Sequence, residues 1–281
     1  MPFESLKSYF DSMPVAFTVI KLVLNKNGEP IDFIFCYGND AFAKLEGIAL
    51  TDMLNKRFYK DVFTDRSDTK WLDFYYSCAF LNQNHELHDY SPEIDKYLKI
   101  VCYPWLEKGY CACLLFDETE LVNMKKRLNR LANVDEFTNF NNRNAYQNFC
   151  NTNKNKTNTG AIFVDINNLK EVNDRFGHDT GDLLIKTVKD KIKICFNEKS
   201  DQIFRIGGDE FVIIIQNISY EACRKRVIKL KKSMTNHYIP FLPNVLASIG
   251  WHWQDRFVSI KALVDKADQE MYKDKKNLNK S

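Results

Sequence analysis

Two carboxylates stand directly behind a glycine pair in the segment 202–215. Gly207 and Gly208 separate two runs that are rich in β-branched and aromatic residues, a pattern typical of a β-hairpin. Asp209 and Glu210 follow the glycines at once. Acidic residues are disfavoured in strands, and successive side chains of a strand point to opposite faces. A carboxylate pair at this place therefore indicates the binding of a hard cation through oxygen ligands.

A second acidic element lies upstream of this hairpin. Residues 160–165 form an apolar run that ends in Asp165, as expected for a buried strand with a carboxylate at its end. Taken alone, a carboxylate at the end of a strand, such as Asp165, is more often a helix cap or a turn former than a metal ligand. A strand-end carboxylate beside a hairpin carboxylate is also the arrangement with which polymerases and nucleotide cyclases hold divalent metals against phosphates. Together, the two elements predict metal-assisted chemistry on a phosphate-bearing substrate.

Motifs spread over residues 135–281 carry a resemblance to one protein family. The hairpin reads Gly-Gly-Asp-Glu-Phe at 207–211, and a Ser-Ile-Gly segment follows at 248–250. Residues 135–143 resemble the pattern D-x-L-T-G-L-x-N-R, and residues 267–275 resemble A-D-x-A-L-Y-x-A-K. The pattern D-x-D/N-x-F/L-K-x-x-N-D-x-x-G-H-x-x-G-D is matched by Asp165, Lys170, Asn173, Asp174, Gly177, His178, Gly181 and Asp182. This half therefore resembles the GGDEF domain, the catalytic domain of diguanylate cyclases.

The resemblance implies both a fold and a reaction. The fold would be α+β, with a mixed sheet flanked by helices, like a nucleotide cyclase or a polymerase palm. The reaction would be the condensation of two GTP into cyclic di-GMP and two pyrophosphates, each 3′-hydroxyl attacking the α-phosphate of the other GTP. Because one domain holds one GTP, two domains would have to face each other in a homodimer. Catalysis would then rest on positioning and on metal electrostatics.

The resemblance also assigns metal ligands. Asp165, Asp209 and the backbone carbonyl of Ile166 would bind Mg²⁺ or Mn²⁺. Glu210 would either be a further ligand or contact the attacking hydroxyl, and the sequence leaves both roles open. With Asp209 and Glu210, Lys170 belongs to the expected catalytic set.

The remaining expected contacts are with the substrate. Asn173 and Asp182 would hydrogen-bond the guanine edge, where a carboxylate accepts from the N1–H and 2-amino donors. The two lysines, Lys170 and Lys275, would hold the β- and γ-phosphates as point charges. The backbone that leads into the next helix would cradle phosphate through N–H donors. The residues expected there and at the glycine pair are Asn167, Asn168, Gly207 and Gly208.

Departures from the family pattern concern three sites. Glu198 replaces the arginine of the family's inhibitory R-x-x-D product site, although Asp201 is kept, so weak or absent product inhibition is expected. Asn279 stands where a phosphate-binding arginine would be and cannot supply its charge. Asn139 replaces a glycine of the opening motif. A catalytically weak or inactive domain that acts as a GTP-binding regulatory or effector module therefore stays open as the alternative. Arg205, before the glycine pair, is interpreted as a strand-surface charge.

Residues 1–117 differ in character and resemble a PAS sensor domain. An Asn-Asp-Ala-Phe segment at 39–42 resembles the PAS N-x-A-F element, and 117–120 resembles its D-I-T-E exit. The pattern predicts a short helix at 39–45 and strands at 14–24, 31–37, 71–81, 97–103 and 110–116. The expected fold is a PAS-like antiparallel sheet with short helices, whose aromatic residues would either line a pocket for an unknown small-molecule ligand or fill a core. His85 and His88 lie in a polar stretch and are expected in a surface loop rather than at a haem.

A helical linker at 118–134 is expected between the sensor and residues 135–281. Its apolar residues recur at alternating three- and four-residue steps, at Leu121, Met124, Leu128 and Leu131. This spacing is typical of a coiled-coil seam that would dimerise the chain. Packing of the helix against the chain's own PAS-like core would give the same pattern, so both interpretations stand.

Composition narrows the class of protein. The 281 residues carry a net charge of +3, which gives no reason to expect nucleic acid as a partner. No apolar run approaches the ~20 residues of a membrane span, and no signal peptide is visible, so a cytoplasmic location is expected. Eight cysteines occur without a C-x-x-C pair, as in a reducing compartment. Of these, Cys111 and Cys113 lie in an apolar run and are interpreted as small hydrophobic residues.

Overall fold

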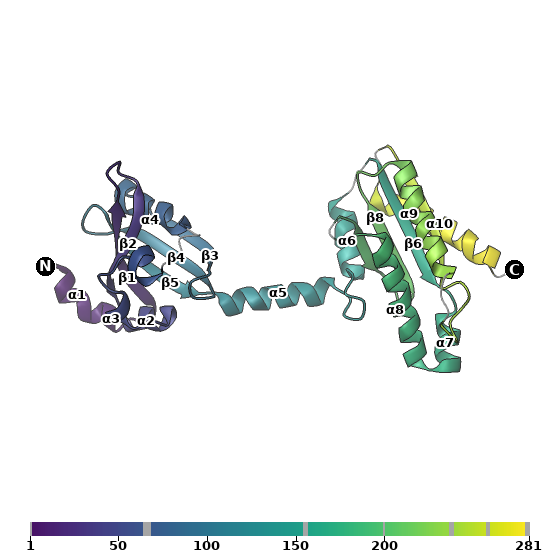
Figure 1. Cartoon of the computed structure of the whole chain (residues 1–281), viewed down its shortest axis with the longest axis horizontal. Coiled ribbons are helices and arrows are strands. Elements are labelled where there is room, and N and C mark those ends of the chain that lie inside the picture. Colours follow the sequence, from purple (N-terminus) through teal and green to yellow (C-terminus); the bar gives the residue numbers. More distant parts are fainter. Residues whose placement is uncertain are drawn as a thin grey trace. The chain divides into compact units, whose positions relative to one another are not determined.

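The computed structural model describes residues 2–63, 69–153, 157–198, 200–235, 239–256 and 259–278. The chain forms two compact units, Met1–Lys126 and Arg127–Ser281, and the division falls within helix α5 (Thr119–Asn133) (Figure 1). The sequence predicts domains at 1–117 and 135–281 with a separate linker helix at 118–134. These limits stay a prediction. In the parts of the chain that the structure describes, none of the helices is both long and apolar enough to cross a membrane.

The first unit is built on a five-stranded antiparallel sheet in the order β2-β1-β5-β4-β3. Its strands are β1 (Ala16–Leu24), β2 (Pro30–Gly38), β3 (His85–Ser91), β4 (Lys96–Pro104) and β5 (Tyr110–Asp117). Its helical elements are α1 (Pro2–Asp11), α2 (Asp40–Glu46), α3 (Leu50–Met53), the π-helical turn η1 (Phe58–Val62) and α4 (Lys70–Leu81). Side chains from α2, α3, η1 and α4 pack with one face of the sheet in the main core of this unit. The expected antiparallel sheet with short helices is confirmed, and the PAS-like identity of the unit stays a prediction.

The capping residue expected before α2 is confirmed. Asn39 is buried, and its Oδ1 accepts hydrogen bonds from the backbone N–H groups of Phe42 at 2.9 Å and Phe17 at 3.1 Å. Its Nδ2 donates to the carbonyl of Val15 at 2.9 Å. One amide side chain therefore both starts α2 and anchors it to the beginning of β1.

The strand expected at 71–81 is wrong, because this segment is helix α4. Its buried residues Trp71, Leu72, Tyr75, Cys78 and Ala79 follow a helical period. Consecutive aromatic residues had suggested a strand, since aromatic side chains are enriched in strands. The helix ends at Asn82, which adopts the left-handed conformation (φ 56°) typical of a C-terminal cap.

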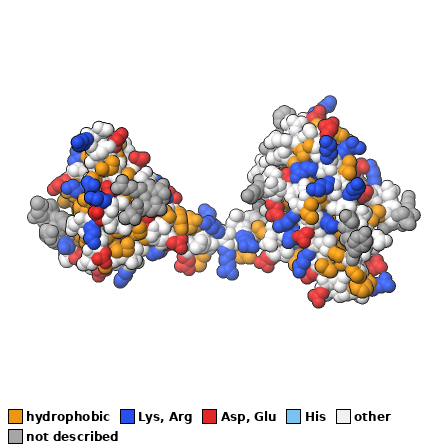
Figure 2. Space-filling model, viewed as in Figure 1, with side chains coloured by type: hydrophobic (Ala, Val, Ile, Leu, Met, Phe, Trp, Pro, Cys, Tyr) orange, Lys and Arg blue, Asp and Glu red, His pale blue; other side chains and the backbone are white. Residues whose placement is uncertain are grey.

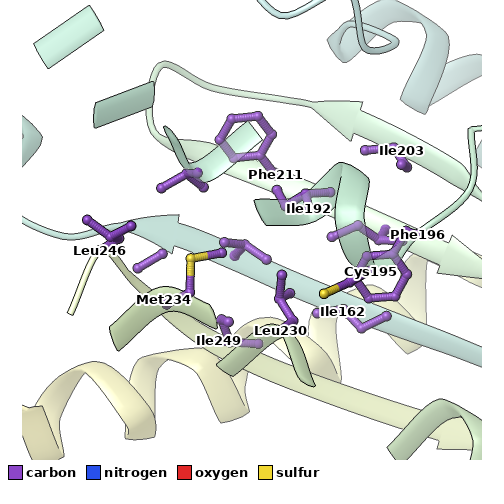
Figure 3. Packing of buried hydrophobic residues seen from close by; sticks show 14 of the residues in the cluster. Ile162, Ile192, Cys195, Phe196, Ile203, Phe211, Leu230, Met234, Leu246 and Ile249 are labelled. Carbon is purple, nitrogen blue, oxygen red and sulfur yellow. The ribbon is translucent and has the colours of Figure 1, made fainter. Parts of the chain in front are cut away.

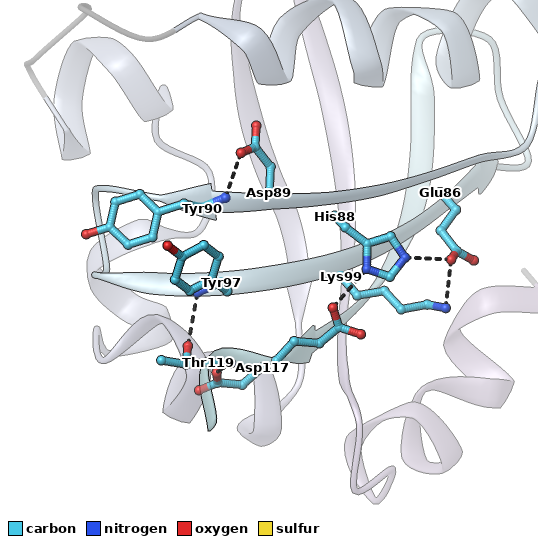
Figure 4. Close-up of polar contacts among 9 residues, drawn as sticks. Glu86, His88, Asp89, Tyr90, Tyr97, Lys99, Asp117 and Thr119 are labelled. Atoms are coloured by element: carbon cyan, nitrogen blue, oxygen red, sulfur yellow. Dashed lines mark hydrogen bonds and ion pairs between the residues drawn. The ribbon is translucent and has the colours of Figure 1, made fainter. Parts of the chain in front are cut away.

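The surface loop expected around His85 and His88 is also wrong, because both residues lie on β3, which pairs with β4 from His85 to Ser91. β3 is an edge strand with polar side chains on both faces, so it lacks the apolar alternation that identifies a strand in a sequence. The imidazole of His88 lies between two carboxylates: its Nε2 is 2.8 Å from Oε1 of Glu86 (Figure 4), and its Nδ1 is 2.8 Å from Oε2 of Glu118. These hydrogen bonds raise the pKa of His88.

The second unit contains a four-stranded sheet in the order β7-β8-β6-β9. Its strands are β6 (Thr159–Ile166), β7 (Gln202–Arg205), β8 (Glu210–Ile215) and β9 (Ala247–Gln254). Its helices after α5 are α6 (Arg143–Thr152), α7 (Leu169–Phe176), α8 (His178–Cys195), α9 (Tyr220–Thr235) and α10 (Ile260–Leu278). The three ladders are antiparallel, and the parallel part of the expected mixed sheet is an isolated bridge between Asn141 and Phe204. The α+β class is confirmed.

Both faces of this sheet are covered, which explains why every residue of β6 is buried. Alternate strand residues such as Ile162 and Ile249 pack with α8 and α9 (Figure 3). The intervening residues, such as Phe163 and Val212, pack with α6 and α10. Helix α9 is amphipathic: Cys223, Val227, Leu230 and Met234 are buried, while Ile228 and most of the lysines and arginines of the helix face solvent. Figure 2 shows that basic, acidic and apolar side chains are interspersed on the visible face of the second unit.

Candidate active site

The two acidic elements found separately in the sequence are neighbours in the sheet. Asp165, near the end of β6, stands opposite Glu210, the first residue of β8. Directly opposed residues of an antiparallel pair share one face of the sheet. The N–H of Ile166 donates to the carbonyl of Asp209 at 2.8 Å. The sheet register therefore brings the strand-end carboxylate beside the hairpin carboxylates.

The hairpin between β7 and β8 is confirmed, and its glycines have different surroundings. The N–H of Ile206 donates to the carbonyl of Glu210 at 2.9 Å, which closes the turn. Neither Gly207 nor Gly208 has a φ in the left-handed region. A Cβ on Gly207 would lie 2.5 Å from Oε2 of Glu210, whereas a Cβ on Gly208 would meet nothing within 4 Å. Gly207 makes room for the Glu210 carboxylate, and Gly208 faces open space.

The interpretation of Arg205 as a strand-surface charge is wrong. Its side chain is 11% exposed, and its guanidinium lies 3.1 Å from Oδ1 of Asp135. A second guanidinium N–H donates to the carbonyl of Gly208 at 2.7 Å. Asp135 also accepts from the N–H and the hydroxyl of Thr138, at 2.8 and 2.6 Å. Arg205 thus joins the opening motif to the glycine hairpin, because Asp135 ends up beside β7 only in the folded chain.

Helix α10 brings Lys275 to the site. Its Nζ lies 2.5 Å from Oδ1 of Asp165. The helix packs closely against β9 at Gly250, where a side chain would not fit: a Cβ on this glycine would lie 2.0 Å from the backbone nitrogen of Met271. Oδ2 of Asp274 accepts the N–H of Ile249 at 2.9 Å, on the edge strand of the sheet. Sequence reasoning missed Asp274, since nothing local marks a residue that caps a distant strand.

The electrostatics of the site favour a cation. Burial raises the pKa of Asp165 against the opposing effect of Lys275, and the charge of Asp209 raises it further. Burial, followed by the charges of Asp209 and Asp165, raises the pKa of Glu210. The pKa of Asp268, on α10, is raised by burial and by Asp265. These carboxylates repel one another, and a positive charge among them would stabilise the site.

The donor set fits a hard divalent cation. Asp165, Asp209, Glu210 and the carbonyl of Ile166 offer oxygen atoms, which Mg²⁺ prefers. Within the described ranges, however, no three carboxylates bring one oxygen each within 4.8 Å of the others. Asp165 has the ammonium group of Lys275 as its partner instead. The expected ligands are therefore neighbours and are not gathered around one point.

The two residues expected to contact guanine lie at the junction of α7 and α8. A Cβ on Gly181 would lie 1.9 Å from Oδ1 of Asn173, so this glycine makes room for the Asn173 amide. Asp182 follows Gly181 directly, and Asn173 and Asp182 are both half-buried. The helix junction thus brings Asn173 beside Gly181, the residue that precedes Asp182.

The expected phosphate cradle is only partly open. The N–H of Asn167 donates to the carbonyl of Leu246, and its Nδ2 to that of Val245, each at 3.0 Å. Both of these Asn167 donors are therefore used within the protein. Asn168 adopts the left-handed conformation (φ 57°) before α7, and Lys170 on that helix is exposed. Asn279 lies outside the described residues.

The comparison with known families decides the identity of the second unit. The family model "Diguanylate cyclase, GGDEF domain" matches residues 132–281. The chain belongs to this family. Cyclic di-GMP phosphodiesterase PdeR of Escherichia coli is 34% identical over 139 residues, which are 47% of this chain and 20% of that protein. Diguanylate cyclase A of Treponema denticola is 31% identical over 126 residues, 43% of this chain and 34% of that protein. The chain therefore spans a fifth to a third of the length of these two relatives.

A solved structure shares the fold. The coiled coil and GGDEF domain of DgcB from Caulobacter crescentus, in complex with c-di-GMP, superposes with a TM-score of 0.50 at 21% identity. This likeness covers 56% of the present chain and 88% of that chain. It supports the GGDEF fold of the second unit.

The segment that corresponds to the family's product site is occupied by internal ion pairs in this GGDEF domain. Glu198 lies 2.6 Å from Nζ of Lys193. Asp201 is buried and pairs with the guanidinium of Arg226, and its Oδ2 accepts the N–H of Asn197 at 2.7 Å. Asp201, the residue of the product-site pattern that this chain keeps, thus has a structural role here.

Proposed function

We propose that this protein is an active diguanylate cyclase, which condenses two GTP into cyclic di-GMP and two pyrophosphates with Mg²⁺ or Mn²⁺. The observation that carries the proposal is the register of β6 and β8, which sets Asp165 opposite Glu210 and beside Asp209. An intact signature hairpin whose carboxylates neighbour Asp165 offers the oxygen ligands that metal-assisted nucleotidyl transfer needs.

Each residue of the site has a task in this proposal. Asp165, Asp209 and the Ile166 carbonyl hold the cation. Glu210 either is a further ligand of this cation or accepts a hydrogen bond from the attacking hydroxyl. The bound cation neutralises phosphate charge and favours attack at the α-phosphate. Lys275 contacts Asp165 and would move to the β- and γ-phosphates when GTP and the metal bind. The metal then balances the charge of Asp165, and the phosphates carry the larger negative charge.

Recognition of the base would fall to the α7–α8 junction. The carboxylate of Asp182 accepts from the N1–H and 2-amino groups of guanine, and the Asn173 amide bonds the same edge. Adenine presents an acceptor at N1 and would leave the Asp182 carboxylate unpaired. Discrimination against ATP should therefore be strong, because an unpaired buried charge is costly.

Two copies of the domain must meet for the reaction, and α5 offers a surface for this. Its four seam residues are more than half exposed, at 62%, 54%, 66% and 53% for Leu121, Met124, Leu128 and Leu131. Burial of this seam against a second copy would remove apolar surface from water. We propose a homodimer through α5, with the first unit as a PAS-like sensor of an unidentified small molecule.

An alternative is a GTP-binding regulatory module without turnover. Asn279 in place of the family's arginine favours it, since that change removes a charge for phosphate. The intact signature hairpin favours the cyclase.

The test uses the full chain with GTP and Mg²⁺, and mass spectrometry for cyclic di-GMP and pyrophosphate. Under the proposal, product forms in the wild type and in the surface variant Asp190→Asn, and it is lost in Asp209→Ala. Binding of GTP without any product, by a protein that is dimeric in solution, would favour the regulatory module. Product that persists in Asp209→Ala would overturn the assignment of the metal site.

A further inference from the structure

Three cysteine sulfurs converge in the core of the first unit. Cys102 lies on β4, and Cys111 and Cys113 lie on β5. Their Sγ atoms all lie within 4.8 Å of one another, and all three side chains are 0% exposed. Cys102 stands opposite Cys113 in the β4–β5 ladder, with 3.3 Å between the two sulfurs. The strand register creates this group, which we call the thiol cluster.

The size of the thiol cluster suits a metal ion. A triangle of sulfurs with sides of about 3.9 Å has its centre about 2.3 Å from each corner, which is the usual Zn–S distance. One sulfur–sulfur separation in the cluster is 3.3 Å and none exceeds 4.8 Å, so all three sulfurs lie close to the required spacing. Small rotations of the cysteine side chains would bring the three sulfurs to bonding distance.

The chemistry of the thiol cluster selects the class of ion. Its ligands are sulfurs alone, which favour soft or borderline ions such as Cu(I) and Zn(II) over Mg²⁺ or Ca²⁺. Cys78, on α4, is also fully buried in the same core and adjoins Cys102. Three sulfurs suit a trigonal Cu(I) site, and Cys78 would supply a fourth for tetrahedral Zn(II).

We propose that Cys102, Cys111 and Cys113 form a binding site for one thiophilic d¹⁰ cation, Cu(I) or Zn(II), within the first unit. The site is closed, because the surrounding residues of the core are apolar and buried. An ion would therefore enter during folding or a local opening, and it would stabilise the folded unit. This site is independent of the GTP chemistry of the second unit.

The experiment is metal reconstitution of the full chain, purified with a reductant and without oxygen. One equivalent of Zn(II) or Cu(I) is added, excess metal is removed with a competing chelator, and retained metal and melting temperature are measured. We expect one ion per chain and a higher melting temperature. X-ray absorption distinguishes the two kinds of site. We expect three sulfur ligands around Cu(I), or four around Zn(II) when Cys78 is included.

Variants locate the site. Cys111→Ser should weaken retention of the ion by more than about tenfold, because it removes a direct ligand. Cys36→Ser, in the same unit and outside the thiol cluster, is the matched control and should retain the ion. Equal retention by both variants would overturn the assignment.

Measurements on the wild-type chain test the proposal even if the variants fail to fold. A reduced wild-type chain that retains neither ion overturns it. So does peptide mapping that finds a Cys102–Cys113 disulfide in protein freshly isolated from cells under alkylating conditions, because the opposed pair would then be oxidised rather than metal-bound. Retention of one ion with sulfur-only coordination supports it.

Discussion

Lys275 Nζ lies 2.5 Å from Asp165 Oδ1 and joins two residues that are 110 positions apart in the chain. The Asp165 side chain is 11% exposed and that of Lys275 is 37% exposed, so the contact reaches from the sheet edge toward solvent. A buried carboxylate requires a partner, and α10 supplies it. The last helix of the described chain therefore completes the candidate site at the end of β6.

Replacement of Lys275 should weaken substrate binding. In Lys275→Met, the triphosphate loses a charged contact worth about 1.5–3 kcal/mol, so KM for GTP should rise by roughly tenfold or more. Steady-state kinetics with saturating Mg²⁺ measures this change. Lys273→Met, on the same helix, removes only a pair with Glu270 and is the matched control. An unchanged KM in Lys275→Met would contradict the phosphate role.

Neutralisation of Glu210 should stabilise the chain when no divalent ion is added. Burial and two neighbouring carboxylates raise the pKa of Glu210 in the folded chain. A raised pKa means that the stability contribution is present below the unfolded value near 4.5 and is lost as pH rises through the folded value. Glu210→Gln should therefore be more stable than the wild type at pH 7, by less than about 1 kcal/mol because solvent screens this half-exposed carboxylate, and should match the wild type at pH 4.

The check on Glu210 is thermal unfolding with EDTA and then with Mg²⁺. We expect the wild type to gain stability from Mg²⁺ and Glu210→Gln to gain less. Glu221→Gln, at an exposed position of α9, should behave as the wild type. A variant that is less stable than the wild type at pH 7 in EDTA would rule out crowding of the carboxylates.

The two glycines of the signature should respond differently to alanine. In Gly207→Ala the new Cβ would lie 2.5 Å from Oε2 of Glu210, so that carboxylate must move and activity should fall by roughly tenfold or more. In Gly208→Ala the Cβ meets no atom of the chain within 4 Å, so stability should stay within about 0.5 kcal/mol of the wild type. Melting temperatures and initial rates of both variants separate the two effects. A larger stability loss in Gly208→Ala than in Gly207→Ala would contradict the geometry.

Asp274 should contribute to stability and to activity. Asp274→Ala removes the acceptor for the N–H of Ile249 and the partner of Lys231, 2.8 Å away. The expected loss is about 1–3 kcal/mol of unfolding free energy, together with a lower rate because α10 carries Lys275. Lys231→Ala removes only the partly exposed ion pair and should cost less than about 1 kcal/mol. Equal losses in urea unfolding would show that the contact with the edge strand contributes nothing.

Product inhibition should be weak or absent. Glu198 stands in place of an arginine and pairs with Lys193, while Asp201 is engaged with Arg226. Two carboxylates with internal partners offer little attraction for the phosphates of cyclic di-GMP. The assay titrates cyclic di-GMP into initial-rate measurements with GTP and Mg²⁺. Inhibition at micromolar product would be the contrary result.

The local signals in the sequence were sufficient for β1, β2, β4 and β5 in the first unit and for β6 in the second. The apolar run that became β6 and the cap at Asn39 depend on neighbouring residues, so they are readable without the fold. The signature hairpin was readable for the same reason. Local signals misled where propensity and period disagreed: the aromatic segment 71–81 is helical, and the polar edge strand β3 has no apolar alternation.

By itself, the sequence determined the family of the second unit and the residue types available for chemistry, because motifs and periodicity are short-range properties. Only the tertiary structure decided which of these residues meet. The ladder register places Asp165 opposite Glu210, and the fold pairs Arg205 with Asp135. Strands β4 and β5 bring the three cysteines of the thiol cluster together. Register and helix docking follow from burial of the whole core, where residues far apart in the chain compete for the same contacts, and no local pattern records the outcome.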